Sequence, residues 1–407
     1  MLLRRFWPVL SFRRLVAISW AILCVAALSA CIQRQTLQNQ PPQPQVAAPS
    51  APIQPVTRGP LLPPGAKVRV ALLLPLTGSS NVLGQAMLDA AAMALYDLGS
   101  DQIQLMPHDT GGAPQGAESA ARAAVADQAR LVIGPLLAAE VEAVKPIARR
   151  ANIPILAFST VTGLAGDGTY LMGFLPQTEI ARIVSFAHAK GANKFAIFAP
   201  RSAYGDVALK AMREAVAANQ STLTLADTFD PAATNLDAAV RSFTTQSQDY
   251  DAILLPEGGS QLRQLAALLN QYGVKPDKVR YLGTGLWDDP SLGSETSLVN
   301  GWYAGPQPGA RADFERRFRA AEGHAPPRLA TLAYDASALA AVLARTPGGA
   351  TYSAAALTNP NGFVGLDGVF RLRDNGLIER ALAILEVHPD GPRIVDPAPQ
   401  SFVAVGG

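Results

Sequence analysis

The strongest constraint on the fold of this chain is a regular alternation, beyond Lys67, of short apolar runs with longer segments of helical periodicity. The apolar runs have the length of buried strands and cover residues 68–74, 103–106, 131–133, 155–158, 195–198, 252–255 and 279–282. The helical segments cover residues 83–98, 117–129, 138–151, 178–190, 207–218, 237–245 and 260–272. Such alternation is typical of βαβ units, in which helices cover both faces of a parallel sheet. The sequence therefore predicts an α/β fold.

The C-terminal part of the chain has a different pattern. A strand is expected over residues 302–304, helices over 312–321 and 330–344, and a hairpin that pairs 369–373 with 378–386. The hairpin turn contains Asp374-Asn375-Gly376, a sequence that favours tight turns. With 407 residues, of which 49% are hydrophobic, the chain has enough apolar material for two lobes.

The N-terminus has the layout of a bacterial signal peptide. Four arginines precede an apolar stretch over residues 15–27, and Leu28-Ser29-Ala30-Cys31 follows. The stretch is shorter than the ~20 apolar residues that span a bilayer, so an uncleaved anchor is the weaker alternative. Leu-Ser-Ala-Cys resembles a lipobox, which implies that residues 1–30 are removed and that Cys31 is lipidated. The other alternative is an ordinary signal peptide with an incidental cysteine.

The lipidated Cys31 and the segment up to residue 66 are expected to form an unfolded tether. Residues 32–66 contain nine prolines, seven glutamines and no acidic or aromatic residue, a composition that cannot build a core. Extended proline-rich chain rises ~3.1 Å per residue, so this linker reaches on the order of 100 Å. Ile32, rather than Asp, follows the cysteine, which by analogy with the Gram-negative sorting rule favours the outer membrane. The expected location is thus the periplasmic side of a bacterial membrane, with the lipid as anchor.

Charge and motifs exclude several classes of function. Without the signal peptide the chain has 30 basic and 32 acidic residues and no basic run, so nucleic-acid binding is not expected. Cys31 is the only cysteine left, and the four histidines lack metal-binding spacing, so neither a metal site nor a cofactor is expected. Hydrolase, phosphate-loop and dinucleotide motifs are absent, and the protein is therefore predicted not to be an enzyme.

Candidate ligand-contacting residues follow the predicted strands, because ligands of open α/β sheets bind at the carboxyl ends of the strands. Trp287 has two interpretations, as a cleft wall or interface anchor, or as a packing residue. The complete set of candidates is Thr77, Gly78, Ser159, Thr160, Gln177, Tyr204, Glu257 and Trp287.

The order of motifs resembles the type 1 periplasmic binding family, in its branch that binds leucine, isoleucine and valine. The motifs are Leu74-Pro75-Leu76-Thr77-Gly78, Ile133-Gly134-Pro135, Ile155 to Thr160, Tyr204-Gly205, Tyr334-Asp335-Ala336 and Gly365-Leu366-Asp367-Gly368. This resemblance implies two doubly wound parallel-sheet lobes that the chain crosses three times. Lobe 1 is then expected to combine about 66–176 with 306–346, and lobe 2 about 177–305 with 347–388, within a domain over 67–390. Residues 391–407 are expected to be a tail.

The resemblance also implies a ligand site between the lobes, but two of its residues differ here. The serine that helps to hold the ligand carboxylate after the third strand is missing from Pro135-Leu136-Leu137-Ala138-Ala139. The acidic residue at the first crossover is replaced by Gln177. A zwitterion in a dry cleft needs a partner for each charge. Glu257 or Arg201 is the remaining candidate for that role.

The departures fit a second resemblance, to outer-membrane lipoproteins that activate penicillin-binding proteins through a domain of this fold. The first functional hypothesis is therefore a non-enzymatic envelope lipoprotein that activates a peptidoglycan synthase. The alternative is the solute-binding component of an amino-acid ABC transporter, with an amino-acid-like ligand and a permease as partners.

Overall fold

Two parallel sheets form the framework of the computed structural model, which describes residues 66–232 and 235–402. Sheet A has the strand order β2-β1-β3-β4-β5, and all of its neighbouring strands are parallel. Its strands are β1 (Val68–Leu74), β2 (Ile103–Asp109), β3 (Leu131–Ile133), β4 (Ile155–Ala157) and β5 (Thr169–Leu171). The expected signal peptide, Cys31 and the linker up to residue 65 lie outside the described residues.

Sheet B has the order β15-β14-β10-β9-β8-β6-β7, in which β14 pairs antiparallel with β10 and β15 pairs antiparallel with β14. Its parallel strands are β6 (Lys194–Pro200), β7 (Thr222–Phe229), β8 (Ala252–Leu254), β9 (Arg280–Gly283) and β10 (Trp302–Gly305). The two strands joined to this sheet by antiparallel pairing are β14 (Ala383–Glu386) and β15 (Arg393–Asp396). A third sheet consists of β11 (Phe363–Gly365), β12 (Gly368–Leu372) and β13 (Ile378–Arg380).

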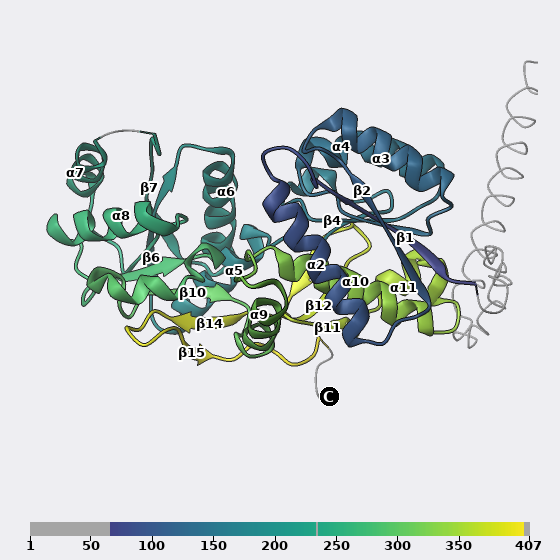
Figure 1. The fold of residues 1–407 in the computed structure, drawn as a ribbon. Coiled ribbons are helices and arrows are strands. Elements are labelled where there is room, and N and C mark those ends of the chain that lie inside the picture. The colour runs from purple at the N-terminus through teal and green to yellow at the C-terminus, as the bar shows by residue number, and fades with distance from the viewer. Residues whose placement is uncertain (1–65, 233–234, 403–407) are drawn as a thin grey trace, which may run out of the picture. The chain divides into compact units, whose positions relative to one another are not determined.

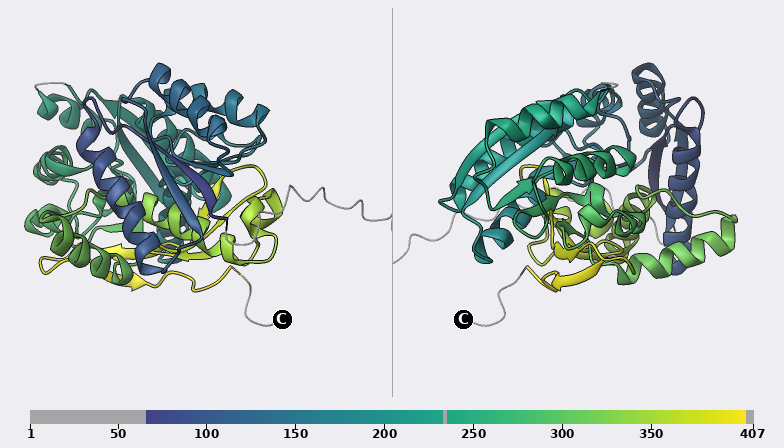
Figure 2. Two further views of the ribbon diagram at one scale, coloured as in Figure 1. Left: turned by 45° about the vertical axis from the view of Figure 1, so that its right-hand side comes forward. Right: turned by 90° about the vertical axis from the view of Figure 1, so that its left-hand side faces the viewer.

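Helices cover both faces of sheet A because alternate residues of its buried strands point to opposite sides. Val70 and Leu72 of β1 face a core shared with α2 (Asn81–Asp97) and α10 (Ala330–Arg345). Ala71 and Leu73 face a second core shared with α3 (Pro114–Ala126) and α4 (Ala138–Arg150). Figures 1 and 2 show these two helix layers on either side of the sheet. The predicted α/β class is confirmed.

Sheet B is covered in the same way. Ile197 of β6 faces α5 (Pro176–Ala189) and α6 (Ala203–Ala218), whereas Phe198 faces α7 (Leu236–Gln246) and α8 (Gly259–Gln271). The remaining helices are α9 (Gly309–Glu322) and α11 (Ala354–Leu357). Phe314 and Phe318 anchor α9 against α2, so α9 belongs with sheet A.

The chain passes between the two lobes three times, through residues 173–175, 306–308 and 381–382. We define lobe 1 as residues 66–172 with 309–380, and lobe 2 as residues 176–305 with 383–398. By this definition residues 347–380 belong to lobe 1, although the sequence analysis expected the whole of 347–388 in lobe 2, and residues 383–388 belong to lobe 2. Tyr352, Leu357 and Phe370 are part of the lobe 1 core beside sheet A. An apolar pattern predicts that a segment is buried, but it does not determine which of two cores receives it.

Two other expectations about the C-terminal part need correction. The hairpin around Asp374-Asn375-Gly376 ends with β13 and does not extend to residue 386 as expected. After β13 the chain crosses to lobe 2, where β14 pairs with β10. The expected tail contains β15, which pairs with β14. The residues of β15 are largely exposed, so the sequence carried no burial signal for this strand. It forms because β14 offers an unpaired edge.

Candidate functional site

The carboxyl ends of the two parallel sheets meet at the first crossing. The chain leaves sheet A at the end of β5 and enters α5 within five residues. The first turn of α5 lies at the carboxyl end of sheet B, because Glu179 accepts a hydrogen bond from the backbone N–H of Gly285, just after β9 (3.0 Å). The loops that follow the strands of both sheets are thus brought to one region, which we take as the candidate site.

The lobe 2 wall of this site is a set of polar groups from three loops. The hydroxyl of Tyr204, which follows β6, lies 2.9 Å from Oγ1 of Thr284, which follows β9. Glu257 follows β8, is half-buried, and accepts the N–H of Gly258 at 3.0 Å. Burial raises the pKa of Tyr204, and the nearby carboxylates of Glu179 and Glu257 raise it further. Lobe 2 therefore presents hydroxyl and carboxylate oxygens and suits a group that donates hydrogen bonds.

Glu179 is a buried carboxylate in this wall, with 4% of its surface exposed. Burial raises its pKa to about 7, although the Gly285 N–H and the charge of Arg328 act in the opposite direction. Near neutral pH this side chain is therefore protonated in part of the molecules. Sequence reasoning missed Glu179, because its place in the wall depends on a contact with Gly285, which is far away in the sequence.

The lobe 1 wall begins at the loop between β1 and α2, which Asp109 holds in place. One oxygen of Asp109 accepts the N–H groups of Leu76 (2.8 Å) and Thr77 (3.1 Å), and the other accepts the Thr77 hydroxyl (2.6 Å). Burial alone would raise the pKa of Asp109, but these hydrogen bonds and that of Gly111 lower it overall. The hydroxyl hydrogen of Thr77 is thus already used in the hydrogen bond to Asp109. Gly78 is exposed beside Thr77 and has a positive φ of 80°.

Three other candidates lie near the end of β4 and the first crossing. Ser159 is buried, and its hydroxyl accepts the N–H of Val161 at 3.2 Å, so it stabilises its own turn. Thr160 is exposed beside it. Gln177 lies in the first turn of α5, and its buried amide oxygen has no hydrogen-bond partner among the described residues.

Trp287 does not line the site, because it is buried in the lobe 2 core with 1% of its surface exposed. Its Nε1 donates to the carbonyl oxygen of Leu255 (3.1 Å), and its ring lies 6.4 Å from that of Tyr303. The packing interpretation therefore describes this residue, and its use as a cleft wall or interface anchor is corrected. Its neighbour Leu286 is the residue of this loop that faces solvent.

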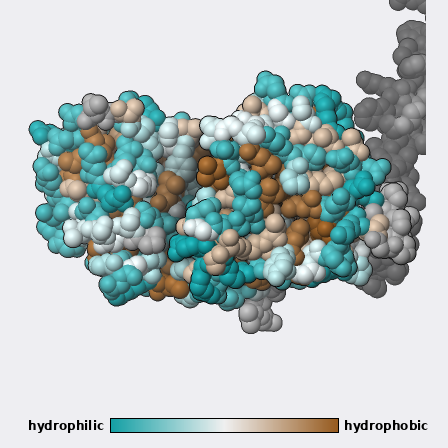
Figure 3. All heavy atoms as spheres, viewed as in Figure 1, coloured by the Kyte–Doolittle hydropathy of each residue, from teal (hydrophilic) through white to brown (hydrophobic). Residues whose placement is uncertain are grey.

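Apolar side chains are exposed around the same edges. Val82, Leu137 and Val161 expose 72%, 38% and 49% of their surface on lobe 1, and Leu286 exposes 45% on lobe 2. Each of them lies in the segment that follows a parallel strand. Figure 3 shows a hollow between the lobes on one face, with apolar residues on both of its sides. The site thus combines a polar wall with an apolar rim.

Comparison with known proteins establishes the family. The family model described as periplasmic binding protein matches residues 67–392. The chain belongs to the periplasmic binding protein family.

Solved structures agree with this assignment at the level of the fold. A putative branched-chain amino acid ABC transporter from Rhodospirillum rubrum has a TM-score of 0.71 and 17% identity, covering 81% of this chain and all of that one. The substrate-binding protein of a branched-chain amino acid transporter from Streptococcus pneumoniae, in complex with isoleucine, has a TM-score of 0.58 and 19% identity, covering 81% of this chain and 100% of that one.

A curated relative from Rickettsia prowazekii is described as an uncharacterized protein. It is 22% identical over 216 residues, which are 51% of this chain and 58% of the relative. The match thus spans less than two thirds of the relative's length.

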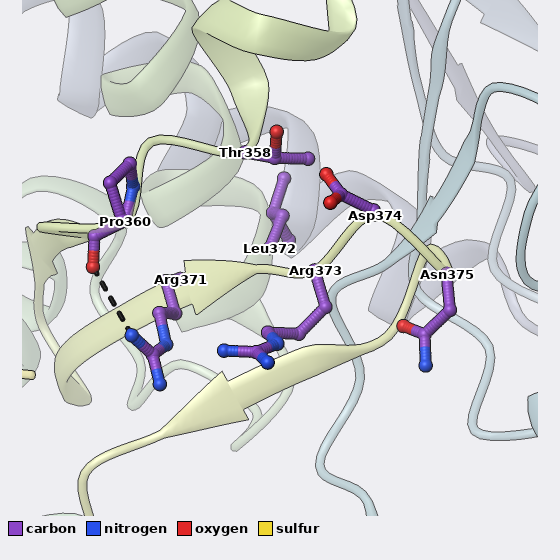
Figure 4. A pocket seen from close by; sticks show the side chains of 7 residues that line it. All are labelled: Thr358, Pro360, Arg371, Leu372, Arg373, Asp374 and Asn375. Atoms are coloured by element: carbon purple, nitrogen blue, oxygen red, sulfur yellow. Dashed lines mark hydrogen bonds between the residues drawn. The ribbon is translucent and has the colours of Figure 1, made fainter. Parts of the chain in front are cut away.

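Features outside the site add little to the chemistry of this periplasmic binding protein. Within residues 66–232 and 235–402, no group of three potential ligand side chains is placed to hold a metal ion, and no helix has the length and apolarity to span a bilayer. A hollow of about 410 Å³ lies beside β12. Figure 4 shows Arg371 and Arg373 at its edge, and Glu379 pairs with both of them. Asp374 also lines the hollow, so that with Glu379 two carboxylates accompany the two arginines there.

Replacing Glu179 by Gln should change how the stability of this periplasmic binding protein depends on pH. The folded protein holds the Glu179 proton up to a pH of about 7, whereas the ordinary pKa of a glutamate carboxyl group is 4.5. The free energy of unfolding of the wild type therefore falls as the pH rises from about 4.5 through about 7, by about 3 kcal/mol in total. Glu179→Gln removes this loss. Urea unfolding should show that the free energy of unfolding of the variant, relative to that of wild type, is higher at pH 8 than at pH 5.

The matched control for this prediction is Glu142→Gln, which removes an exposed carboxylate from α4. This variant shows how much the removal of one negative charge changes the free energy of unfolding in general. If Glu179→Gln and wild type have parallel stability profiles between pH 5 and pH 8, the raised pKa of Glu179 is wrong.

Proposed function

We propose that this protein is the solute-binding component of an ABC transporter and that it holds a small amino-acid-like molecule between its lobes. The observation that carries the proposal is the meeting of the carboxyl ends of both parallel sheets at the first crossing, with a polar wall on lobe 2. Hinge closure around a ligand is the motion that two lobes with three crossings allow. The isoleucine complex of the Streptococcus pneumoniae protein supports the class of ligand.

The rim and the wall suit the two parts of such a molecule. The exposed side chains of Val82, Leu137, Val161 and Leu286 offer apolar surface to an aliphatic or aromatic part, whose burial is favourable by about 25 cal/mol per Å². Glu257, half-buried beside Tyr204, supplies a negative partner for an ammonium group. Arg201, exposed at the same edge of lobe 2, supplies a positive one.

Thermal unfolding of the full chain with a panel of compounds tests this proposal. The panel contains leucine, isoleucine, arginine, benzoate and peptidoglycan stem peptides at millimolar concentration. A ligand at 100 times its dissociation constant stabilises the folded state by ~2.7 kcal/mol. For a domain of this size the midpoint should then rise by roughly 4 °C. Absence of a shift with every compound would contradict solute binding.

The variant Glu257→Gln identifies the contact to the ammonium group. We expect it to weaken the binding of an amine-bearing ligand by about tenfold to a hundredfold, because a hydrogen bond to a charged group contributes about 1.5–3 kcal/mol. Titration calorimetry measures the change. Glu142→Gln on α4 is the control of the same chemistry and should leave the affinity unchanged. Equal affinity of wild type and Glu257→Gln would remove Glu257 from the site.

A second function, activation of a peptidoglycan synthase by a lipid-anchored envelope protein, is favoured by the loop after β3. In this loop the N–H of Leu137 is bonded to the Glu140 carboxylate (3.0 Å), and no hydroxyl side chain is present. A ligand carboxylate could not accept a hydrogen bond from the Leu137 N–H and would be repelled by the Glu140 carboxylate. This arrangement favours a protein partner over an amino-acid ligand. Lipidation of Cys31 and an outer-membrane location belong to this proposal. Binding of the full chain to the periplasmic part of such a synthase, without any small-molecule shift, would support it.

A further inference from the structure

A group of charged side chains lies at the junction of the two lobes. We call it the hinge cluster, and it consists of Asp288, Arg311, Arg328, Asp335, Asp367 and Arg380. Asp288 belongs to lobe 2, where it directly follows the buried Trp287. The other five belong to lobe 1. The cluster thus contains ion pairs that connect one lobe to the other.

Asp288 makes the connection between the lobes. Its Oδ1 accepts from Nη2 of Arg311 at 3.0 Å, and its Oδ2 accepts from Nη1 of Arg311 and from Nε of Arg328 at 3.2 Å. The side chain of Asp288 is 4% exposed and that of Arg311 is 10% exposed. A bidentate ion pair that is buried in this way is weakened little by salt.

Arg328 links this pair to the first crossing and to the rest of lobe 1. Its Nη1 and Nη2 donate to the carboxylate of Asp367 at 3.2 and 2.8 Å. Its guanidinium lies 4.3 Å from the ring centre of Phe174, a residue of the first crossing, and Arg380 approaches the same ring at 5.1 Å. Arg380 is the last residue before the third crossing and donates to the carbonyl oxygen of Met172 (2.9 Å).

Both ends of the Asp288–Arg311 pair are fixed to rigid parts of their lobes. Trp287 anchors Asp288 in the lobe 2 core. Arg311 lies in the first turn of α9, which Phe314 and Phe318 hold against α2 in lobe 1. Because neither end can follow the other, a rotation of the lobes about the crossings has to break or shear this pair.

We propose that Asp288 is an electrostatic latch that holds the two lobes in the arrangement described here and sets how often they separate. The neighbouring Asp289 has no such role, because its partner Arg263 is on α8 of the same lobe (3.7 Å). The latch acts in the protein without ligand, so the proposal does not depend on the nature of the solute or of any protein partner.

The test measures the distance between spin labels on the two lobes of the full chain without ligand. The labels replace Glu142 on α4 and Arg213 on α6, both exposed, through a ketone-bearing amino acid that leaves the native cysteines untouched. In Asp288→Asn we expect a second interlobe distance whose population is about tenfold or more above that in wild type. Arg311→Lys keeps the charge but loses the two-pronged geometry, and it should give a smaller increase.

The matched control is Asp289→Asn, the same chemical change one residue further along. It should leave the distance distribution as in wild type, because the Arg263 pair does not cross between the lobes. A folded Asp288→Asn with the wild-type distribution would overturn the proposal, as would the same change in Asp289→Asn. If Asp288→Asn does not fold, Arg311→Lys decides by the same criterion.

Discussion

Replacing Arg380 by methionine is expected to lower the free energy of unfolding by about 3–5 kcal/mol, because it removes one partner from a buried group of charges. Arg380 is nearly inaccessible to solvent, and its Nη1 lies 3.7 Å from Oδ2 of Asp335. Methionine has a similar length and no charge, so the loss reports mainly on the carboxylate of Asp335, whose ion pair is removed, whereas Asp367 keeps its pair with Arg328. Urea unfolding followed by far-ultraviolet circular dichroism measures it.

The pH dependence of this loss distinguishes charge from packing. Burial raises the pKa of Asp335, and the charge of Asp367 raises it further, whereas Arg380 lowers it. Without Arg380 the pKa of Asp335 should be higher still. At low pH the carboxyl group of Asp335 then takes up a proton and loses its charge. Arg380→Met is therefore expected to be less destabilised at pH 5 than at pH 8. If the free energy of unfolding falls by the same amount at pH 5 and at pH 8, the loss of packing alone is responsible.

The control for Arg380 is Arg373→Met on the same hairpin. Arg373 is half-exposed and pairs with Glu379 at 3.3 Å. Partly exposed pairs of this kind contribute under about 1 kcal/mol. A loss for Arg373→Met as large as that for Arg380→Met would refute the argument from burial.

Replacing Trp287 by alanine is expected to cost about 3–5 kcal/mol of unfolding free energy, since it removes a large buried side chain and leaves a cavity. The indole ring packs directly on the backbone at Gly283 and Gly301, where a Cβ atom would lie 2.1 and 2.7 Å from ring atoms. Its loss also leaves the carbonyl oxygen of Leu255 without this donor. Circular dichroism is the appropriate signal for urea unfolding, because the substitution removes a fluorophore.

The adjacent residue provides the control for this prediction. Leu286 is 45% exposed, and Leu286→Ala should change the stability by about 0.5 kcal/mol or less. Ligand binding is expected to depend on Leu286 rather than on Trp287. Leu286→Ala should weaken the binding of an apolar solute, whereas a third variant, Trp287→Phe, should bind it as wild type does. A Trp287→Ala variant as stable as wild type would show that the indole is not part of the lobe 2 core.

The strands that the sequence predicts correctly are those with strong burial signals. The run over residues 68–74 is β1, and 131–133 is β3, because all or nearly all of these residues are buried between helix layers. Four strands were not predicted, namely β5, β7, β11 and β15. β11 and β15 are short and contain no fully buried residue. β5 has only three residues, and β7 lies at the edge of sheet B with a half-exposed face, so neither produces a long apolar run.

Candidate residues could be proposed from the sequence where they lie shortly after a parallel strand. Tyr204 lies on the first turn of α6, just beyond β6, and Glu257 lies just beyond β8, and the structure places both on the lobe 2 wall. Glu179 escaped prediction because its place in the wall depends on a contact with Gly285, 106 residues away. Trp287 was ambiguous because the pattern of its loop does not show which of two neighbouring side chains points inward.

The sequence by itself determined the alternation of strands and helices, and with it the parallel sheets and the edge at which their loops gather. These features depend on periodicity and on the residues that follow each strand, which are local properties of the chain. Only the tertiary structure decided which core receives residues 347–380 and how Asp288, Arg311 and Arg380 come together. The physical reason is that burial and ion pairing are satisfied between segments far apart in the chain, and no local pattern specifies which segments meet.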